Sequence, residues 1–194
     1  MQIFKKNKIY FFTVILLSFY TVIFVTGCDN ESNAQGNETQ FTETYSGSFV
    51  SSSIATDSND DGSPANFGEF AGTSTFGNVL IQSLNEFEPA LENADCNDGL
   101  IEFTLVQGHF VKRFENGDLI FGNWASGVSC FDTETMTSTT TQIGNFSGGT
   151  GQFSSATGPI QIDYDSNFLA DNAEQGFSFG GSDGTGEGTI ILNN

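Results

Sequence analysis

The spacing of apolar residues after residue 40 constrains the fold most, because they alternate with polar residues over short runs and never sustain a helical period. Such alternation is typical of half-buried β-strands. The chain also contains 23 glycines, which suit turns and bulges better than helices. Strands are expected near residues 45–55, 69–76, 78–88, 100–114, 118–130, 134–147, 151–164 and 175–192.

Eight strands at this spacing predict an all-β domain. A single antiparallel eight-stranded barrel is favoured, and a β-sandwich is the alternative, because either architecture protects exposed strand edges. The segment Glu115–Asp118 places Asn-Gly between two apolar runs, which predicts a tight hairpin. The longest candidate helix is Asp165–Glu174, where Phe168, Leu169 and Ala173 can share one face.

The amino terminus has the pattern of an export signal. Lys5, Lys6 and Lys8 precede an apolar run from Ile9 to Val25, as in a secretory signal peptide. The run ends in Val-Thr-Gly-Cys at residues 25–28, which resembles the lipobox of bacterial lipoproteins. The resemblance implies cleavage before Cys28 and lipid on its thiol. The alternative is an uncleaved anchor, although ~20 apolar residues are needed to span a bilayer.

These features predict three parts: a lipoprotein signal peptide at 1–27, a lipidated flexible tether at 28–40 and a β-barrel domain at 41–194. The tether is polar and carries no aliphatic or aromatic side chain larger than alanine after Cys28. We therefore expect an extracytoplasmic protein of the cell envelope, held at a membrane through lipid on Cys28. Whether that membrane is the inner or the outer one stays open.

Charge limits the partners of the domain. From Cys28 onward, only Lys112 and Arg113 are basic against 24 acidic residues, a formal net charge of −22. Such a field repels phosphate backbones and anionic headgroups. Nucleic acid is therefore not expected as a partner, and contact with lipid should come through the anchor.

The cysteines predict one disulfide. With Cys28 modified by lipid, Cys96 and Cys130 remain, and thiols in an oxidising compartment pair by default. The bond would close a loop of about 35 residues and stabilise the fold by roughly 3 kcal/mol.

A family resemblance enters at residues 144–158, with the sequence GNFSGGTGQFSSATG. This segment is similar to the GGTGRFxxATG signature of barrels related to allene oxide cyclase and dirigent proteins, and residues 114–122 resemble a hairpin of bacterial members of that group. The resemblance implies an eight-stranded antiparallel barrel around an apolar cavity, with Phe153 as a plug. Gln152 stands where the signature has Arg. Catalytic residues cannot be transferred, and a fold does not define an activity.

The segment Asp57–Gly62 matches the first half of a calcium-binding loop. Asp57, Asn59 and Asp61 would supply side-chain oxygens, and Ser63 would supply a carbonyl. Position 12 of the loop is Gly68 rather than Glu, so an acidic turn is the alternative to a Ca²⁺ site.

His109 and Arg113 share the strand register of Ile101, Phe103 and Leu105, which would direct both into a cavity. Paired with an acid such as Glu86 or Glu102, they could transfer protons. A bulge near Gly108 would instead turn both side chains outward.

These observations favour a non-enzymatic lipoprotein whose barrel binds a small apolar molecule or a surface partner in the envelope. One alternative is an enzyme of cyclase or isomerase type that works in the barrel cavity. Another is a structural envelope protein stabilised by calcium. An open cavity faced by His109, Arg113 or a buried carboxylate would favour the enzyme, and a barrel plugged by Phe and Leu side chains would favour partner binding or structure.

Overall fold

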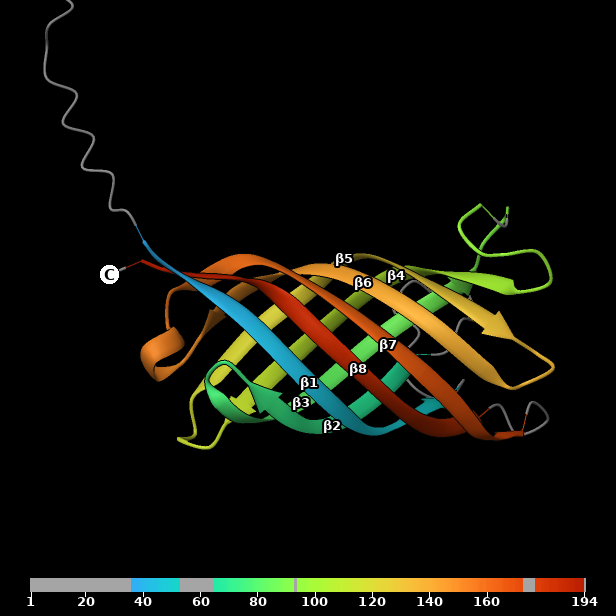
Figure 1. Ribbon diagram of the computed structural model, residues 1–194, viewed down its shortest axis with the longest axis horizontal. Coiled ribbons are helices and arrows are strands. Elements are labelled where there is room, and N and C mark those ends of the chain that lie inside the picture. Colours follow the sequence, from blue (N-terminus) through green and yellow to red (C-terminus); the bar gives the residue numbers. More distant parts are fainter. Residues whose placement is uncertain (1–35, 53–64, 93, 173–176, 194) are drawn as a thin grey trace, which may run out of the picture. The chain divides into compact units, whose positions relative to one another are not determined.

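The computed structural model describes residues 36–52, 65–92, 94–172 and 177–193. Within these residues, eight antiparallel strands form a closed barrel in which each strand pairs with its neighbours in sequence and β8 pairs with β1 (Figure 1). The strands are β1 (Asn37–Ser52), β2 (Ala65–Ser74), β3 (Gly77–Pro89), β4 (Ile101–Phe114), β5 (Leu119–Asp132), β6 (Thr137–Gly149), β7 (Ala156–Asn172) and β8 (Phe177–Leu192). The predicted barrel is confirmed, and the sandwich is not formed.

Two segments differ from those expected. Strand β1 already includes residues 37–40, which the sequence assigned to the tether, because their backbone pairs with the last residues of β8. The helix predicted at Asp165–Glu174 is wrong: its described residues, 165–172, belong to β7. There the backbone pairs with β6 or β8, and a bulge between Phe168 and Ala170 interrupts the alternation that would have identified a strand.

The β4–β5 connection confirms the predicted hairpin. Gly117 adopts a positive φ of 86°, a conformation that glycine adopts without the strain of a Cβ. Hydrogen bonds join Phe114 N to Asp118 O and Gly117 N to Phe114 O. This turn fixes the register in which β4 and β5 pair.

One end of the barrel is filled by aromatic rings. A short 3₁₀ helix, η1 (Gly151–Phe153), lies at this end, where a strand was expected to begin (Figure 1). It inserts Phe153, which is completely buried, with ring centroids 5.1 Å from Phe76 and 4.8 Å from Phe114. Phe41 and Phe146 pack edge to face at 5.5 Å. Phe153 is therefore a plug, as the family resemblance implied.

At the opposite end, the β3–β4 connection is held against the barrel by the predicted disulfide. Cys96 and Cys130 are bonded, with their Cα atoms 5.5 Å apart. The carboxylate of Glu102 accepts hydrogen bonds from the backbone N–H groups of Asp95 and Cys96 at 2.8 and 3.2 Å. The two contacts attach this connection to β4 and β5.

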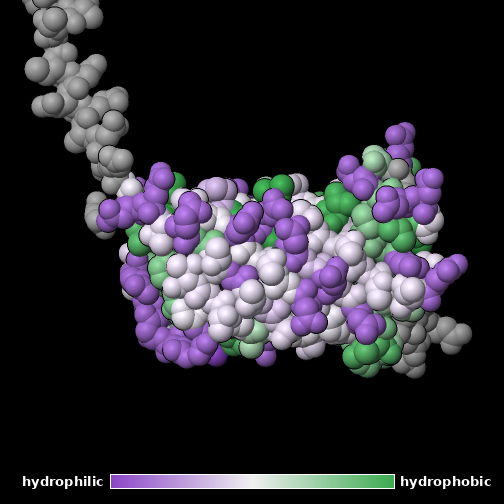
Figure 2. Space-filling view, in the orientation of Figure 1, coloured by the Kyte–Doolittle hydropathy of each residue, from purple (hydrophilic) through white to green (hydrophobic). Residues whose placement is uncertain are grey.

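The outer surface is largely polar, and one view of it shows larger apolar areas toward the end that carries the β3–β4 connection (Figure 2). Phe179, Val50, Phe67 and Leu84 are exposed outward-facing neighbours across β8, β1, β2 and β3 at this end. No helix among the described residues has the length and apolarity to cross a bilayer.

Candidate ligand-binding cavity

The barrel interior is hollow on the side away from the Phe153 plug. The cavity there has a volume of about 470 Å³, which is within the range of small-molecule sites. All eight strands contribute to its wall. Its apolar lining residues are Tyr45, Phe49, Phe70, Ile81, Phe87, Pro89, Phe103, Trp124, Phe131, Met136, Ile162, Tyr164 and Phe168.

The space exists because inward positions carry small hydroxyl side chains. Ser138 and Thr140 on β6, Ser166 on β7 and Ser182 on β8 are buried and line the cavity. Three of these hydroxyl groups make cross-strand hydrogen bonds: Ser166 and Ser182 are 2.7 Å apart, and Thr140 donates to Ser129 of β5 at 2.8 Å. The space that larger side chains would occupy is left open.

Phenylalanines surround part of the cavity at the end opposite the plug, the open end, where the described residues leave the interior unfilled. Ring centroids are 6.5 Å apart for Phe103 and Phe131, 5.0 Å for Phe131 and Phe168, and 5.0 Å for Phe168 and Phe49. The three contacts are edge to face, a favourable geometry for aromatic pairs. Among the described residues, the cavity wall at this end is therefore aromatic.

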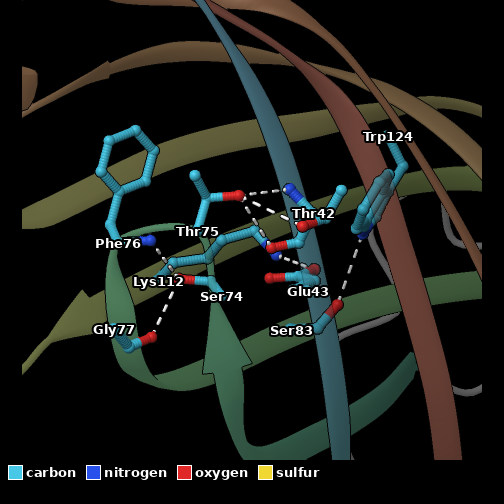
Figure 3. Close-up of polar contacts among 9 residues, drawn as sticks. All are labelled: Thr42, Glu43, Ser74, Thr75, Phe76, Gly77, Ser83, Lys112 and Trp124. Carbon is cyan, nitrogen blue, oxygen red and sulfur yellow. Dashed lines mark hydrogen bonds and ion pairs between the residues drawn. The ribbon is translucent and has the colours of Figure 1, made fainter.

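A buried ion pair forms the floor of the cavity. Lys112 of β4 donates to Glu43 of β1 across the barrel, with 2.5 Å between Nζ and Oε1 (Figure 3). The side chains are 1% and 0% exposed. The ammonium also lies 5.5 and 5.1 Å from the ring centroids of Phe41 and Phe110, close enough for cation–π attraction.

Burial has opposite effects on the ionisable groups near the floor. It lowers the pKa of Lys112, and the neighbouring Glu43 carboxylate opposes this by favouring the charged ammonium. It raises the pKa of Tyr45, with smaller contributions from Tyr164 and Glu43. Burial also raises the pKa of Tyr164, and a hydrogen bond with Thr140 opposes this shift. Both tyrosines therefore stay neutral over the physiological range.

Four polar atoms at the floor have no hydrogen-bond partner among the described residues. They are Oε2 of Glu43, the hydroxyl of Tyr45, and both Oε1 and Nε2 of Gln142. All three side chains line the cavity, and Gln142 is completely buried. An unsatisfied buried polar group costs about 1–3 kcal/mol, so these atoms define a place where a polar ligand group would be stabilised.

Trp124, the single tryptophan of the chain, also lines this region. Its ring centroid lies 4.5 Å from that of Phe110, and its Nε1 donates to Ser83 at 3.4 Å (Figure 3). The indole can therefore report on occupancy of the cavity through its fluorescence.

His109 and Arg113 do not reach the cavity: both are exposed on the outer face of β4, so their assignment to the interior is wrong. The register shifts where Glu86 and Phe87 pair with Gln107 and Leu105, which leaves Val106 as an extra residue in β4. This bulge reverses the alternation for the rest of the strand. The outward alternative is therefore the one observed, with the bulge two residues before Gly108.

The acids considered as partners for His109 also lie outside the cavity lining. Glu86 accepts a hydrogen bond from Gln107 at 2.9 Å, and Glu102 binds the β3–β4 connection. Among the described residues, the acid that lines the cavity is Glu43.

The remaining predicted sites lie outside the described residues. These are the lipidated Cys28 and the calcium loop at Asp57, Asn59, Asp61 and Ser63, and they stay predictions. Among the residues that are described, no group of three or more His, Cys, Asp or Glu side chains is placed to hold a metal ion.

Sequence reasoning missed Glu43 and Lys112, although the sequence contains a signal for both. Glu43 lies between Phe41 and Tyr45, and Lys112 lies between Phe110 and Phe114, each at a spacing of two residues. In a strand, residues two apart share a face. A charged residue flanked in this way by aromatic residues is therefore placed on the buried face. Gln142 has no comparable flanking pattern.

No family model matches the chain, and no curated protein matches it. Among solved structures, the chain is similar to a pterocarpan synthase dirigent protein at 13% identity, over 81% of this chain and 88% of that one, with a TM-score of 0.34. The barrel assignment rests on the strand pairing of this chain and not on that likeness.

Proposed function

We propose that this protein is a lipid-anchored binding protein of the cell envelope, whose barrel takes up a small, mainly apolar molecule. The observation that carries the proposal is the cavity of about 470 Å³, whose lining surface is mainly apolar. Apolar lining with a few polar groups is the usual composition of small-molecule sites. Because the aromatic plug closes one end of the barrel, the interior is a pocket rather than a channel.

Binding can be tested with the neutral fluorescent probe N-phenyl-naphthylamine, which brightens in apolar surroundings. We expect saturable, one-site enhancement with the purified full-length chain. Ser138→Phe would place a ring in the cavity and should abolish the enhancement. Thr139→Phe, one residue further along β6, places the same ring on the exposed outer face and should leave it unchanged.

Equal fluorescence enhancement in both variants would assign the probe to the outer surface and refute the proposal for the cavity. Thermal unfolding of each variant checks that both are folded. An inward ring at Ser138 has free space to enter, so Ser138→Phe should melt within a few degrees of the parent chain.

The lipid anchor is the second part of the proposal, supported by residues 25–28 and the basic and apolar segments before them. Cells that express the full chain should incorporate radiolabelled palmitate into it, and Cys28→Ser should lose the label. Cys96→Ser serves as the control, because the Cys96 thiol forms the disulfide with Cys130. Retention of label in Cys28→Ser would refute lipidation at this residue.

A second candidate is an enzyme of cyclase or isomerase type. The specific observation that favours it is that the hollow interior contains a buried carboxylate, Glu43, paired with the Lys112 amine, so that a proton could move in a site shielded from water. This candidate ranks second because the carboxylate is engaged by Lys112 and neither His109 nor Arg113 faces the cavity. Glu43→Gln separates the two candidates: it should abolish turnover by an enzyme, whereas a binding protein has no turnover to lose.

A further inference from the structure

We propose that the cavity selects a ligand whose polar group is electrically neutral and presents a hydrogen-bond donor beside an acceptor, with a carboxamide as the simplest example. This inference rests on the proposed binding function and specifies the class of ligand. The polar group would lie at the floor, next to Gln142, and the apolar body would extend toward the open end.

The charge of the floor supports a neutral group. Glu43 and Lys112 are the charged residues among the described side chains that line the cavity, and they neutralise each other. A ligand carboxylate or ammonium would add a third, uncompensated charge in a region shielded from solvent. Burial of an unpaired charge is strongly unfavourable, so charged ligands should be rejected.

The unpartnered atoms support a group with both a donor and an acceptor. The amide of Gln142 has an acceptor, Oε1, and a donor, Nε2, and neither has a partner among the described residues. A ligand carboxamide would form two antiparallel hydrogen bonds with this amide. The Tyr45 hydroxyl and Oε2 of Glu43 remain for a further donor or acceptor of the ligand.

The walls above the floor fit the apolar body of such a ligand. Ile81 and Ile162 line the cavity together with Phe70 and Trp124. Their side chains offer no charge to compete with the floor. The body would thus contribute affinity through burial of apolar surface, and the floor would decide which polar group is accepted.

Three probes with one apolar body test the inference: para-butylbenzamide, para-butylbenzoate and para-butylbenzylamine. Quenching of Trp124 fluorescence in the full-length chain gives each dissociation constant. We expect the amide to bind at least about tenfold more tightly than either charged probe, a difference of about 1.4 kcal/mol. Equal or tighter binding of the benzoate or the benzylamine would overturn the inference and leave the proposed function intact.

Failure of all three probes, together with failure of N-phenyl-naphthylamine, would instead refute the proposed function itself. If N-phenyl-naphthylamine binds while the amide does not, the cavity binds ligands but the inference about the polar group is wrong. The two levels of the proposal are therefore distinguished by the same set of titrations.

Variants locate the selectivity at the floor. Gln142→Leu should lose about tenfold in affinity for the amide. Thr141→Leu introduces the same residue at the adjacent outward-facing position and should leave the affinity unchanged. Glu43→Gln leaves the Lys112 ammonium without its counter-charge and should shift the preference toward the benzoate. An unchanged amide preference in both Gln142→Leu and Glu43→Gln would overturn the inference. Should either variant fail to fold, the probe series on the parent chain still decides.

Discussion

The two ends of the barrel use the same inward-facing strand positions in different ways. At the plugged end, these positions carry large apolar residues such as Phe41, Ile120 and Phe146, all buried. Toward the open end, Ser138 and Ser166 occupy equivalent inward positions and leave a cavity. One half of the interior is thus packed and the other half is hollow. We infer that the plugged half supplies most of the stability and the open half supplies binding.

The largest expected effect is at the plug. Phe153→Ala removes a completely buried ring that packs against Phe76 and Phe114, and truncation of a buried Phe costs about 3–5 kcal/mol. Urea unfolding should show this loss in the free energy of unfolding. N-phenyl-naphthylamine should still bind to the fraction that remains folded.

Phe103→Ala is the matched change at the open end. Phe103 is only partly buried, and its ring centroid lies 6.5 Å from that of Phe131, so its truncation should cost roughly 1 kcal/mol. Equal losses of stability in the two variants would refute the division of roles between the ends. Weaker probe binding by Phe103→Ala alone would support it.

The ion pair lies where the two halves meet. Lys112→Met leaves Glu43 as a buried carboxylate without its counter-charge, and removal of one partner from such a pair costs about 3–5 kcal/mol. Chemical denaturation should show the loss. Glu43→Leu combined with Lys112→Met removes both charges and should recover most of it, because a buried ion pair contributes little net stability compared with apolar residues.

Failure of the double variant to recover would mean that the pair itself stabilises the barrel. Recovery of stability with an unchanged preference for the neutral probe would mean that neither property needs the pair, because a floor without charges also disfavours a buried ligand charge.

The disulfide is the next effect in size, and it lies on the hollow side. Cys96→Ala with Cys130→Ala should cost roughly 3 kcal/mol of global stability. Hydrogen exchange should accelerate more at the β3–β4 connection than around Phe153, because loss of the bond permits local opening there in addition to the global loss. Uniform acceleration over the whole barrel would contradict this local role.

Sequence reasoning recovered the fold well because barrel strands follow local rules. Alternation and glycine content predicted eight strands, and the Asn-Gly pair located the β4–β5 hairpin. These features depend on neighbouring residues alone. The helix expected at 165–174 was wrong because pairing with β6 and β8, which is non-local, determines the conformation of this segment.

The site was harder to predict, and single-residue bulges explain much of the difficulty. The extra residue Val106 turns His109 and Arg113 outward and Lys112 inward. No local pattern fixed the position of that bulge to better than a few residues. Lys112 of β4 and Glu43 of β1 are also 69 residues apart in the sequence. Their inward placement could be predicted from the flanking aromatic residues, but their pairing could not.

The pH dependence of stability also distinguishes the two halves. Tyr45 and Tyr164 line the cavity, and burial raises the pKa of each above the ordinary tyrosine value near 10. Above that pH the unfolded chain releases these protons while the folded barrel keeps them. The free energy of unfolding should therefore fall by up to about 1.4 kcal/mol per pH unit for each tyrosine.

Lys112 has the opposite sign, because its folded pKa is lowered: its contribution to stability rises with pH until the unfolded lysine titrates near 10.4. The fall in stability caused by the tyrosines should thus be clearest above that value.

The double variant Tyr45→Phe with Tyr164→Phe should flatten this fall in the free energy of unfolding, measured with urea across the same pH range. If the fall persists in that variant, its origin lies outside the hollow half. The plugged half would not explain it either, since the rings of Phe41, Phe114, Phe146 and Phe153 that fill it carry no ionisable group.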